Sequence, residues 1–164
     1  MNLILPLLEF NLNCVHFGEK QKNTVIWNSF FIKLIYSIPE ISLNGIFILI
    51  DFKEKQIGKD YNKYKIKFNV HDNQDLIHRI ELIEKTILHK INIVDKTPRL
   101  SIYEQFKNGH LKLNLNHNYF NQDDICILKL SGVWENSTEY GITFKYFLSN
   151  HRSNNNSQSS ALSQ

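Results

Sequence analysis

Residues 125–147 read ICILKLSGVWENSTEYGITFKYF, and this stretch is the most informative about the fold. Apolar residues fill both of its ends and ENSTE lies between them, which predicts two strands joined by a short polar turn. Basic and aromatic side chains are spread along both strands, at Lys129, Trp134, Tyr140 and Lys145. Single-stranded nucleic acid requires such a surface, because lysines contact phosphates and rings stack on unpaired bases. An ordinary core hairpin with solvated lysines fits the same residues.

Length and composition indicate one globular domain. The chain has 164 residues, of which 42% are hydrophobic and 21% charged, with a formal net charge of +3 and a pI near 8.8. This charge permits a polyanionic partner without requiring one. Alanine occurs once and arginine three times, whereas residues with A/T-rich codons abound, so the positions of the lysines are more informative than their number. We predict a single domain over residues 1–148 and a flexible polar tail over 149–164.

The cysteines and the apolar segments indicate a cytoplasmic protein. Cys14 and Cys126 are far apart in the sequence, which favours two free thiols over a disulfide scaffold. The first ten residues are apolar but have no basic leader and include Glu9, so we predict no signal peptide. No apolar run approaches the roughly 18 to 20 residues of a membrane span. We therefore expect no membrane contact.

The segment upstream of the hairpin is rich in strand-forming residues. Residues 24–38 are dense in β-branched and aromatic side chains, which predicts a strand that stops at Pro39. Trp27, Phe31 and Lys33 fall at alternate positions of this segment. In a regular strand they would share one face.

Two further strands are predicted over residues 46–52 and 61–70, with a charged loop over 53–60 between them. In the second strand, apolar side chains from Tyr64 to Val70 alternate with lysines, so one face would be buried and the other wet. The wet face carries Lys63, Lys65 and Lys67. These lysines form either a stripe that follows a phosphate backbone or a solubilising surface.

One helix is clearly predicted after these strands. Asp72 or Asn73 can cap it. Apolar residues then recur at spacings of three and four, and charged residues including Glu84 cover the other side. The apolar stripe consists of Leu76, Ile80, Ile83, Ile87 and Ile91. Strands, one helix and more strands predict an α+β, mainly β fold, specifically an OB-like Greek-key barrel with one helix between its strand groups.

No motif in the chain indicates catalysis or a metal site. His78 and His89 are eleven residues apart on the predicted helix, roughly 16 Å, which is too far for one ion to bridge. Cys14 lies two residues from His16, but no other feature marks a nucleophile site. The chain has no P-loop, GxGxxG or GxSxG motif. We therefore predict a protein that is not an enzyme and binds no cofactor or metal.

Part of the hairpin resembles a known family. LKLSGVW at residues 128–134, followed after a short polar gap by YGITFK at 140–145, is similar to the closing strands of OB-fold single-stranded DNA-binding proteins. The similar proteins come from large cytoplasmic DNA viruses and yeast cytoplasmic linear plasmids. Several of them end in an acidic tail that contacts replication partners, whereas no acidic residue follows Glu139 in this chain. The resemblance implies DNA binding at a replication site in the host cytoplasm, with replication proteins as partners. The departure at the C-terminal tail argues against carrying over the acidic-tail mechanism.

The residues and the resemblance together predict a sequence-independent single-stranded DNA-binding protein that supports replication of a viral or cytoplasmic plasmid genome. Lysines would neutralise phosphates, and Trp27, Trp134 and Tyr140 would stack on bases. Two alternatives stay open: a viral structural or assembly protein that uses the sheet for protein contacts, and a factor that binds duplex ends. The predicted binding residues are Trp27, Lys33, Lys63, Lys65, Lys67, Lys129, Trp134, Tyr140 and Lys145.

Overall fold

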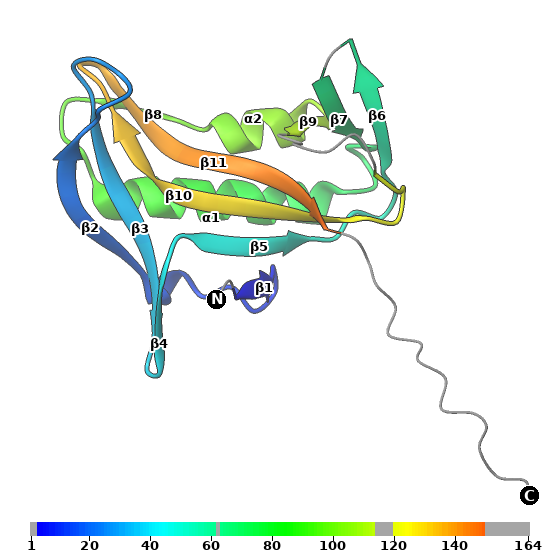
Figure 1. Cartoon of the computed structure of the whole chain (residues 1–164), viewed down its shortest axis with the longest axis horizontal. Helices are drawn as coiled ribbons and strands as arrows, with labels where there is room; N and C mark the ends of the chain where they lie inside the picture. The colour runs from blue at the N-terminus through cyan, green and yellow to red at the C-terminus, as the bar shows by residue number, and fades with distance from the viewer. Residues whose placement is uncertain (1–2, 62, 114–119, 150–164) are drawn as a thin grey trace, which may run out of the picture.

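Two β-sheets and two α-helices make up the part of the chain that the computed structural model describes, which is residues 3–61, 63–113 and 120–149 (Figure 1). The eight strands of the large sheet are β1 (Ile4–Pro6), β2 (Val15–Lys22), β3 (Phe30–Ile38), β4 (Ile41–Asn44), β5 (Ile46–Ile50), β8 (Thr97–Arg99), β10 (Ile125–Glu135) and β11 (Glu139–Ser149). The small sheet and the helices comprise β6 (Gln56–Asp60), β7 (Lys63–Lys67), β9 (His110–Leu113), α1 (Gln74–Ile91) and α2 (Ser101–Lys107), and a 3-10 turn covers Leu12–Cys14.

β10 is the centre of the large sheet. β11 pairs with it in antiparallel orientation, which confirms the predicted hairpin. The other edge of β10 is shared, because β5 pairs with residues 126–130 and β3 pairs with residues 132–135. A bulge between Leu130 and Gly132 separates these two segments. The prediction of an α+β, mainly β fold is confirmed, but the sheets do not close as a barrel would.

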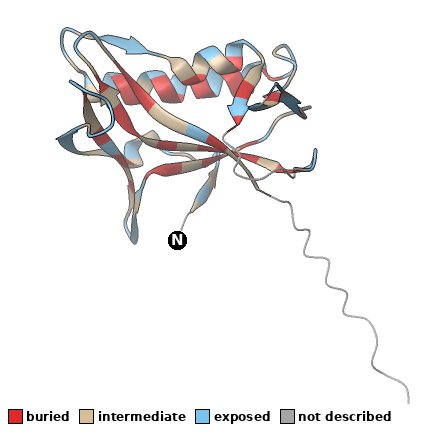
Figure 2. Cartoon of the chain, turned by 45° about the horizontal axis from the view of Figure 1, so that its top comes forward, coloured by how far each residue is buried: buried red, intermediate tan, exposed pale blue. Residues whose placement is uncertain are grey.

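Both helices pack on the same side of the large sheet (Figure 1). α1 ends at Asn92, which adopts the left-handed conformation with φ 45° and donates its backbone N–H to Leu88 O. Four of the five residues in the predicted apolar stripe, Leu76, Ile80, Ile83 and Ile87, are buried. The core therefore lies between the helices and the inward face of the sheet, as the buried residues in Figure 2 show.

The prediction that Glu84 faces solvent is wrong. Its side chain is fully buried where α1 contacts α2. The carboxylate accepts hydrogen bonds from the backbone N–H groups of Ile102 (3.0 Å) and Tyr103 (2.8 Å), at the start of α2. Burial raises the pKa of Glu84 from 4.5 to about 7, although these hydrogen bonds act to lower it. Glu84 therefore holds α2 against α1.

The prediction of a strand over residues 24–38 is wrong for its first six residues, because residues 23–29 form a loop between β2 and β3. The Asn23 side chain accepts hydrogen bonds from the N–H groups of Val25 (2.9 Å) and Ile26 (3.2 Å), which closes a local turn. Asn28 adopts a positive φ of 56°, a conformation that asparagine tolerates better than most residues. These local interactions outweigh the strand propensity of the apolar residues.

The small sheet contains two strands, β6 and β7, from the region where the sequence predicted a loop over residues 53–60 and a strand over 61–70. The predicted loop over 53–60 is wrong for residues 56–60, which form β6 and pair with β7. The alternation predicted for β7 is confirmed, because Ile66 is buried while Lys63 and Lys67 are exposed on the opposite face. β9 pairs with the other edge of β7.

Three further predictions concern the thiols, the tail and the membrane. Both cysteines are free, as predicted, with Cys126 buried and Cys14 half-buried. Ser149 is the last residue of β11, and the rest of the predicted tail lies outside the described residues. Within the described ranges, neither α1 nor α2 is long and apolar enough to cross a membrane.

Candidate nucleic-acid interface

Among the residues that the structure describes, no helix lies on one face of the large sheet, and three of the predicted lysines lie on that face. In β3 and β5 the buried residues alternate with residues that point away from the helices, and the residues of β10 and β11 that share the Lys129–Lys145 side of the sheet continue this outward surface. Lys129 of β10 is directly opposite Lys145 of β11, and Lys33 of β3 is opposite Gly132 of β10. We refer to the outward residues of these four strands as the open face: Phe31, Lys33, Ile35, Phe47, Leu49, Ile127, Lys129, Trp134, Thr143, Lys145 and Phe147.

Aromatic rings lie between these lysines. Phe31, Phe47, Trp134 and Phe147 are all half-buried, so part of each side chain is open to solvent. Phe31 is opposite Trp134 across the β3–β10 pair. The ammonium group of Lys129 lies 5.1 Å from the centroid of the Phe47 ring, a cation–π contact between neighbouring strands. The open face thus alternates positive charge with rings.

Glycine allows the aromatic side chains to lie close to the sheet. An added Cβ at Gly132 would lie 2.5 Å from Ile32 O and would also overlap the Phe31 ring. At Gly141 it would lie 2.9 to 3.1 Å from three atoms of the Trp134 ring, which therefore lies flat over this glycine. One face of the Trp134 ring is consequently used in packing on Gly141.

No carboxylate side chain lies among the residues that define the open face. The two acidic residues at the β10–β11 turn are both paired with basic groups. Glu135 forms ion pairs with Lys20 and with Lys96 Nζ (3.1 Å), and Glu139 pairs with Arg99 Nε (3.0 Å). Burial acts to raise the pKa of Glu135, but its two lysine partners outweigh burial and hold the pKa below its usual value. No acidic side chain of the open face therefore neutralises its three lysines.

The prediction that the Tyr140 ring stacks on bases is wrong. Tyr140 is only 5% exposed and lies on the inward face of β11. Its hydroxyl donates a hydrogen bond to Leu88 O of α1 at 3.4 Å. A base approaching from solvent cannot reach the ring, because α1 covers it.

Lys63, Lys65 and Lys67 are not part of the open face. They lie on β7 in the small sheet, where Lys65 is opposite Lys112 of β9. The side chain of Tyr64 points to the other side of this sheet, where it packs against Phe120. We call Lys63, Lys65, Lys67 and Lys112 the lysine face. The sequence-predicted lysines therefore occupy two separate surfaces.

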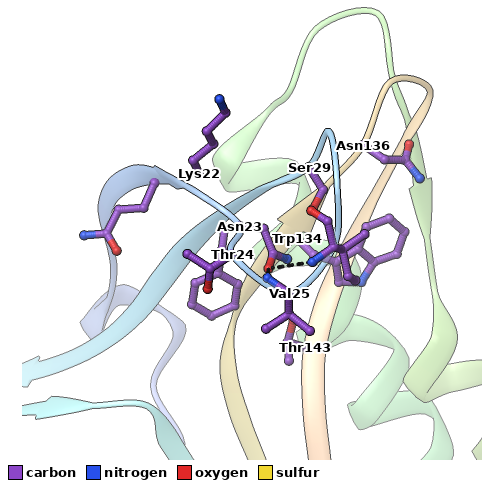
Figure 3. Close-up of a pocket in the computed structure, with 11 residues that line it drawn as sticks. Lys22, Asn23, Thr24, Val25, Ser29, Trp134, Asn136 and Thr143 are labelled. Atoms are coloured by element: carbon purple, nitrogen blue, oxygen red, sulfur yellow. Dashed lines mark hydrogen bonds between the residues drawn. The ribbon is translucent and has the colours of Figure 1, made fainter.

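Trp27 lies in the 23–29 loop, not on a strand, and is 93% exposed. Its neighbours Val25 and Ile26 are 90% and 57% exposed. The loop borders a pocket of about 610 Å³ beside the ends of β10 and β11. Figure 3 shows Trp134 and Thr143 on the sheet side of this pocket, with Thr24 and Val25 on the loop side.

Sequence reasoning missed Phe31, Phe47 and Phe147 as members of the site. Phe47 lies between Ile46 and Ile48, so a run of five apolar residues hides which of them face outward. Phe147 lies two residues from Lys145 and therefore on the same face of β11, but the sequence does not identify this face as the open one. The pairing of Lys129 with Lys145 in the predicted hairpin could have indicated that both lysines, and the rings beside them, lie on one face, because paired residues share a face.

The described residues contain no group of three or more side chains that could hold a metal ion. No family model, no curated protein and no solved structure matches this chain. The chemistry of the open face is thus the basis for any functional conclusion.

Proposed function

We propose that this protein binds single-stranded DNA across the open face of the large sheet. The observation that carries the proposal is the alternation of Lys33, Lys129 and Lys145 with four half-exposed rings on a sheet face that neither described helix covers. The lysines would contact phosphates, and the rings would stack on bases. Neither interaction reads sequence, so binding is expected to be largely sequence-independent.

The geometry favours single strands over duplex. Bases in a duplex are stacked on each other and cannot lie against Phe47, Phe147 or Trp134. A duplex would therefore use only the lysines, whereas a single strand gains about 1–3 kcal/mol for each base that stacks on a ring. This is the physical reason to expect preference for unpaired DNA.

The OB-like relationship and the role in replication belong to the same proposal. They rest on the resemblance of residues 128–134 and 140–145 to the closing strands of viral and linear-plasmid single-stranded DNA-binding proteins. Binding across an open face does not require a closed barrel. We propose accordingly that the protein covers single strands at a replication site in the host cytoplasm.

Intrinsic fluorescence tests the proposal directly, because both tryptophans lie near one end of the open face. Oligo-dT should quench the emission saturably at low salt, and log K should fall linearly with log salt, since bound phosphates release counterions. Duplex of the same length should compete poorly. No saturable quenching at low salt would refute the proposal, and equal binding of duplex would refute stacking and favour a duplex-end factor.

One observation favours a second candidate function in protein assembly. Val25, Ile26 and Trp27 are contiguous, apolar and mostly exposed, which is unusual for a surface that contacts only water. If the loop is an assembly contact, the protein should self-associate in a way that salt does not weaken. Sedimentation velocity of the wild type and of Val25→Ser at low and high salt distinguishes this candidate, because DNA binding alone predicts no such association.

A further inference from the structure

The loop between β2 and β3 holds its apolar side chains in solvent by means of hydrogen bonds at its base. The backbone N–H of Asn23 donates to Ser29 O (2.9 Å), and the Ser29 hydroxyl donates to Ile26 O (2.8 Å). The Asn23 side chain accepts from the N–H groups of Val25 and Ile26. Val25 and Trp27 are almost fully exposed in this hydrogen-bonded loop. The loop is therefore a preorganised apolar projection, and little conformational freedom is lost when a partner covers it.

The pocket beside this loop is a hollow with apolar walls. Its volume of about 610 Å³ lies in the range of pockets that bury most of a small ligand, so one indole side chain fits inside it. Phe31 and Trp134 line its sheet side, and Val25 lines its loop side. Among the described residues that line it, only Lys22 is charged. Trp27 is not a lining residue, so it does not fill the pocket of its own chain.

The projection and the pocket lie at the same end of the molecule, because one loop contributes to both. When two complementary patches are neighbours, a two-fold axis places the projection of each copy in the pocket of the other and closes the assembly. A head-to-tail chain would instead need the projection and the pocket on opposite sides of each copy. The position of the loop therefore favours a closed dimer over a filament.

We infer that a second copy of this chain docks here, with Trp27 of each copy seated in the pocket of the other. The inference rests on the assembly candidate and not on DNA binding. Each seated Trp27 would contact the free face of the Trp134 ring, whose other face packs on Gly141. Trp134 and Phe31 also belong to the open face, so the dimer forms where no DNA strand occupies that end.

The area of this contact predicts a weak dimer. A buried aromatic side chain covers about 150–250 Å², so two Trp27 side chains and the surfaces that they cover would bury roughly 600–1,000 Å². Interfaces below about 1,200 Å² are typical of weak and transient complexes. Dimers are therefore expected at micromolar protein concentrations, whereas oligonucleotide titrations at nanomolar protein report on the monomer.

Two variants each remove one half of the exchange. Trp27→Ala removes the projection, and Thr143→Trp fills the pocket from its sheet side. In sedimentation velocity the wild type should approach a dimer with rising concentration, and each variant alone should dimerise at least about 30-fold more weakly. The control Val94→Ser removes a 71% exposed apolar side chain outside the pocket and should dimerise like the wild type. Growth beyond a dimer, or equal weakening in the control, would overturn the inference.

A mixture of the two variants distinguishes this exchange from a contact between two projections. The pocket of the Trp27→Ala copy can still receive Trp27 of the Thr143→Trp copy, so an equal mixture should dimerise more strongly than either variant alone. Thr24→Trp, at an exposed position on the loop side of the pocket, replaces Thr143→Trp if that variant does not fold.

The outcomes separate the inference from the other proposals. If the wild type dimerises and the mixture associates no better than the single variants, the inference is overturned and the assembly candidate stands. A wild type that stays monomeric at high concentration overturns both. Neither result bears on the binding of oligo-dT, which tests the proposed function.

Discussion

The open face of the large sheet and the lysine face of the small sheet are similar in charge and different in everything else. The open face carries three lysines, and the lysine face carries four. On the open face, half-buried Phe and Trp side chains lie between the lysines, whereas Tyr64 of β7 turns away from the lysine face. Charge alone attracts any polyanion, but charge with accessible rings favours unpaired bases. Lysine number alone therefore does not identify the binding surface.

The largest expected effect concerns the space around one glycine in each sheet. Gly132→Ala should lower the free energy of unfolding by about 3 kcal/mol, because the new Cβ would lie 2.5 Å from Ile32 O, a backbone atom that cannot move alone. The matched change on the small sheet is Gly58→Ala, where nothing lies within 4 Å. It should be neutral or slightly stabilising. Urea denaturation of both variants measures the two free energies of unfolding, and equal destabilisation would contradict a role for close packing at Gly132.

The second effect compares the lysines of the open face with those of the lysine face in their contribution to DNA binding. The triple variant Lys33→Gln, Lys129→Gln, Lys145→Gln should weaken oligo-dT binding by about 100-fold at low salt and reduce the slope of log K against log salt by about 2. The matched triple variant exchanges Lys63, Lys65 and Lys67 for glutamine. It should change affinity and slope much less. If the β7 variant loses more affinity than the open-face variant, the two surfaces have been assigned the wrong way round.

The third effect concerns α2, which contacts β9 of the small sheet and β11 of the large one. The pKa of Glu84 is raised from 4.5 to about 7, so the folded state binds a proton more tightly than the unfolded state. Stability should therefore be highest below about pH 4.5 as far as Glu84 is concerned, and should fall by roughly 2 kcal/mol as the pH rises to about 6. Glu84→Gln should remove this dependence in thermal denaturation across that range. A wild-type dependence that the variant retains must come from another group.

The smallest expected effect compares two exposed aromatic residues, one near each surface. Trp27 is 93% exposed beside the open face, and Tyr61 is 95% exposed at the β6–β7 turn. Trp27→Ala should weaken oligo-dT binding about fivefold, the lower end of a stacking contribution, without changing stability. Tyr61→Asn, which suits the positive φ of 54° at that position, should leave binding unchanged. Fluorescence anisotropy of a labelled oligonucleotide measures both, and unchanged affinity in Trp27→Ala would remove the loop from the interface.

Local sequence patterns correctly predicted the elements whose apolar and polar residues repeat with the period of a helix or a strand. The spacing of Leu76, Ile80 and Ile83 predicted α1, and the lysine alternation predicted β7. The same reasoning failed for Glu84, because its burial depends on α2, a short helix that carries no clear signal of its own. It failed for residues 24–29 because hydrogen bonds from Asn23 compete with strand propensity.

Which residues form the candidate site depends on the pairing of strands that are far apart in the sequence. Local sequence patterns carry no information on that pairing. Lys33 reaches Lys129 and Lys145 only because β3 and β5 share one edge of β10 on either side of the bulge. Alternation along β11 places Tyr140 and Tyr146 on one face, but alternation does not determine whether that face lies toward the helices. The structure places this group inward, which excludes Tyr140 and identifies the side of Lys145 as open.

Amide NMR of the labelled protein during titration with oligo-dT tests the central claim most directly, because it reports on both surfaces in one experiment. The account predicts saturable shifts in β3, β10 and β11, centred on Lys33, Lys129 and Trp134, with much smaller changes in β6 and β7. Shifts confined to β6 and β7, or no shifts at low salt, would contradict it.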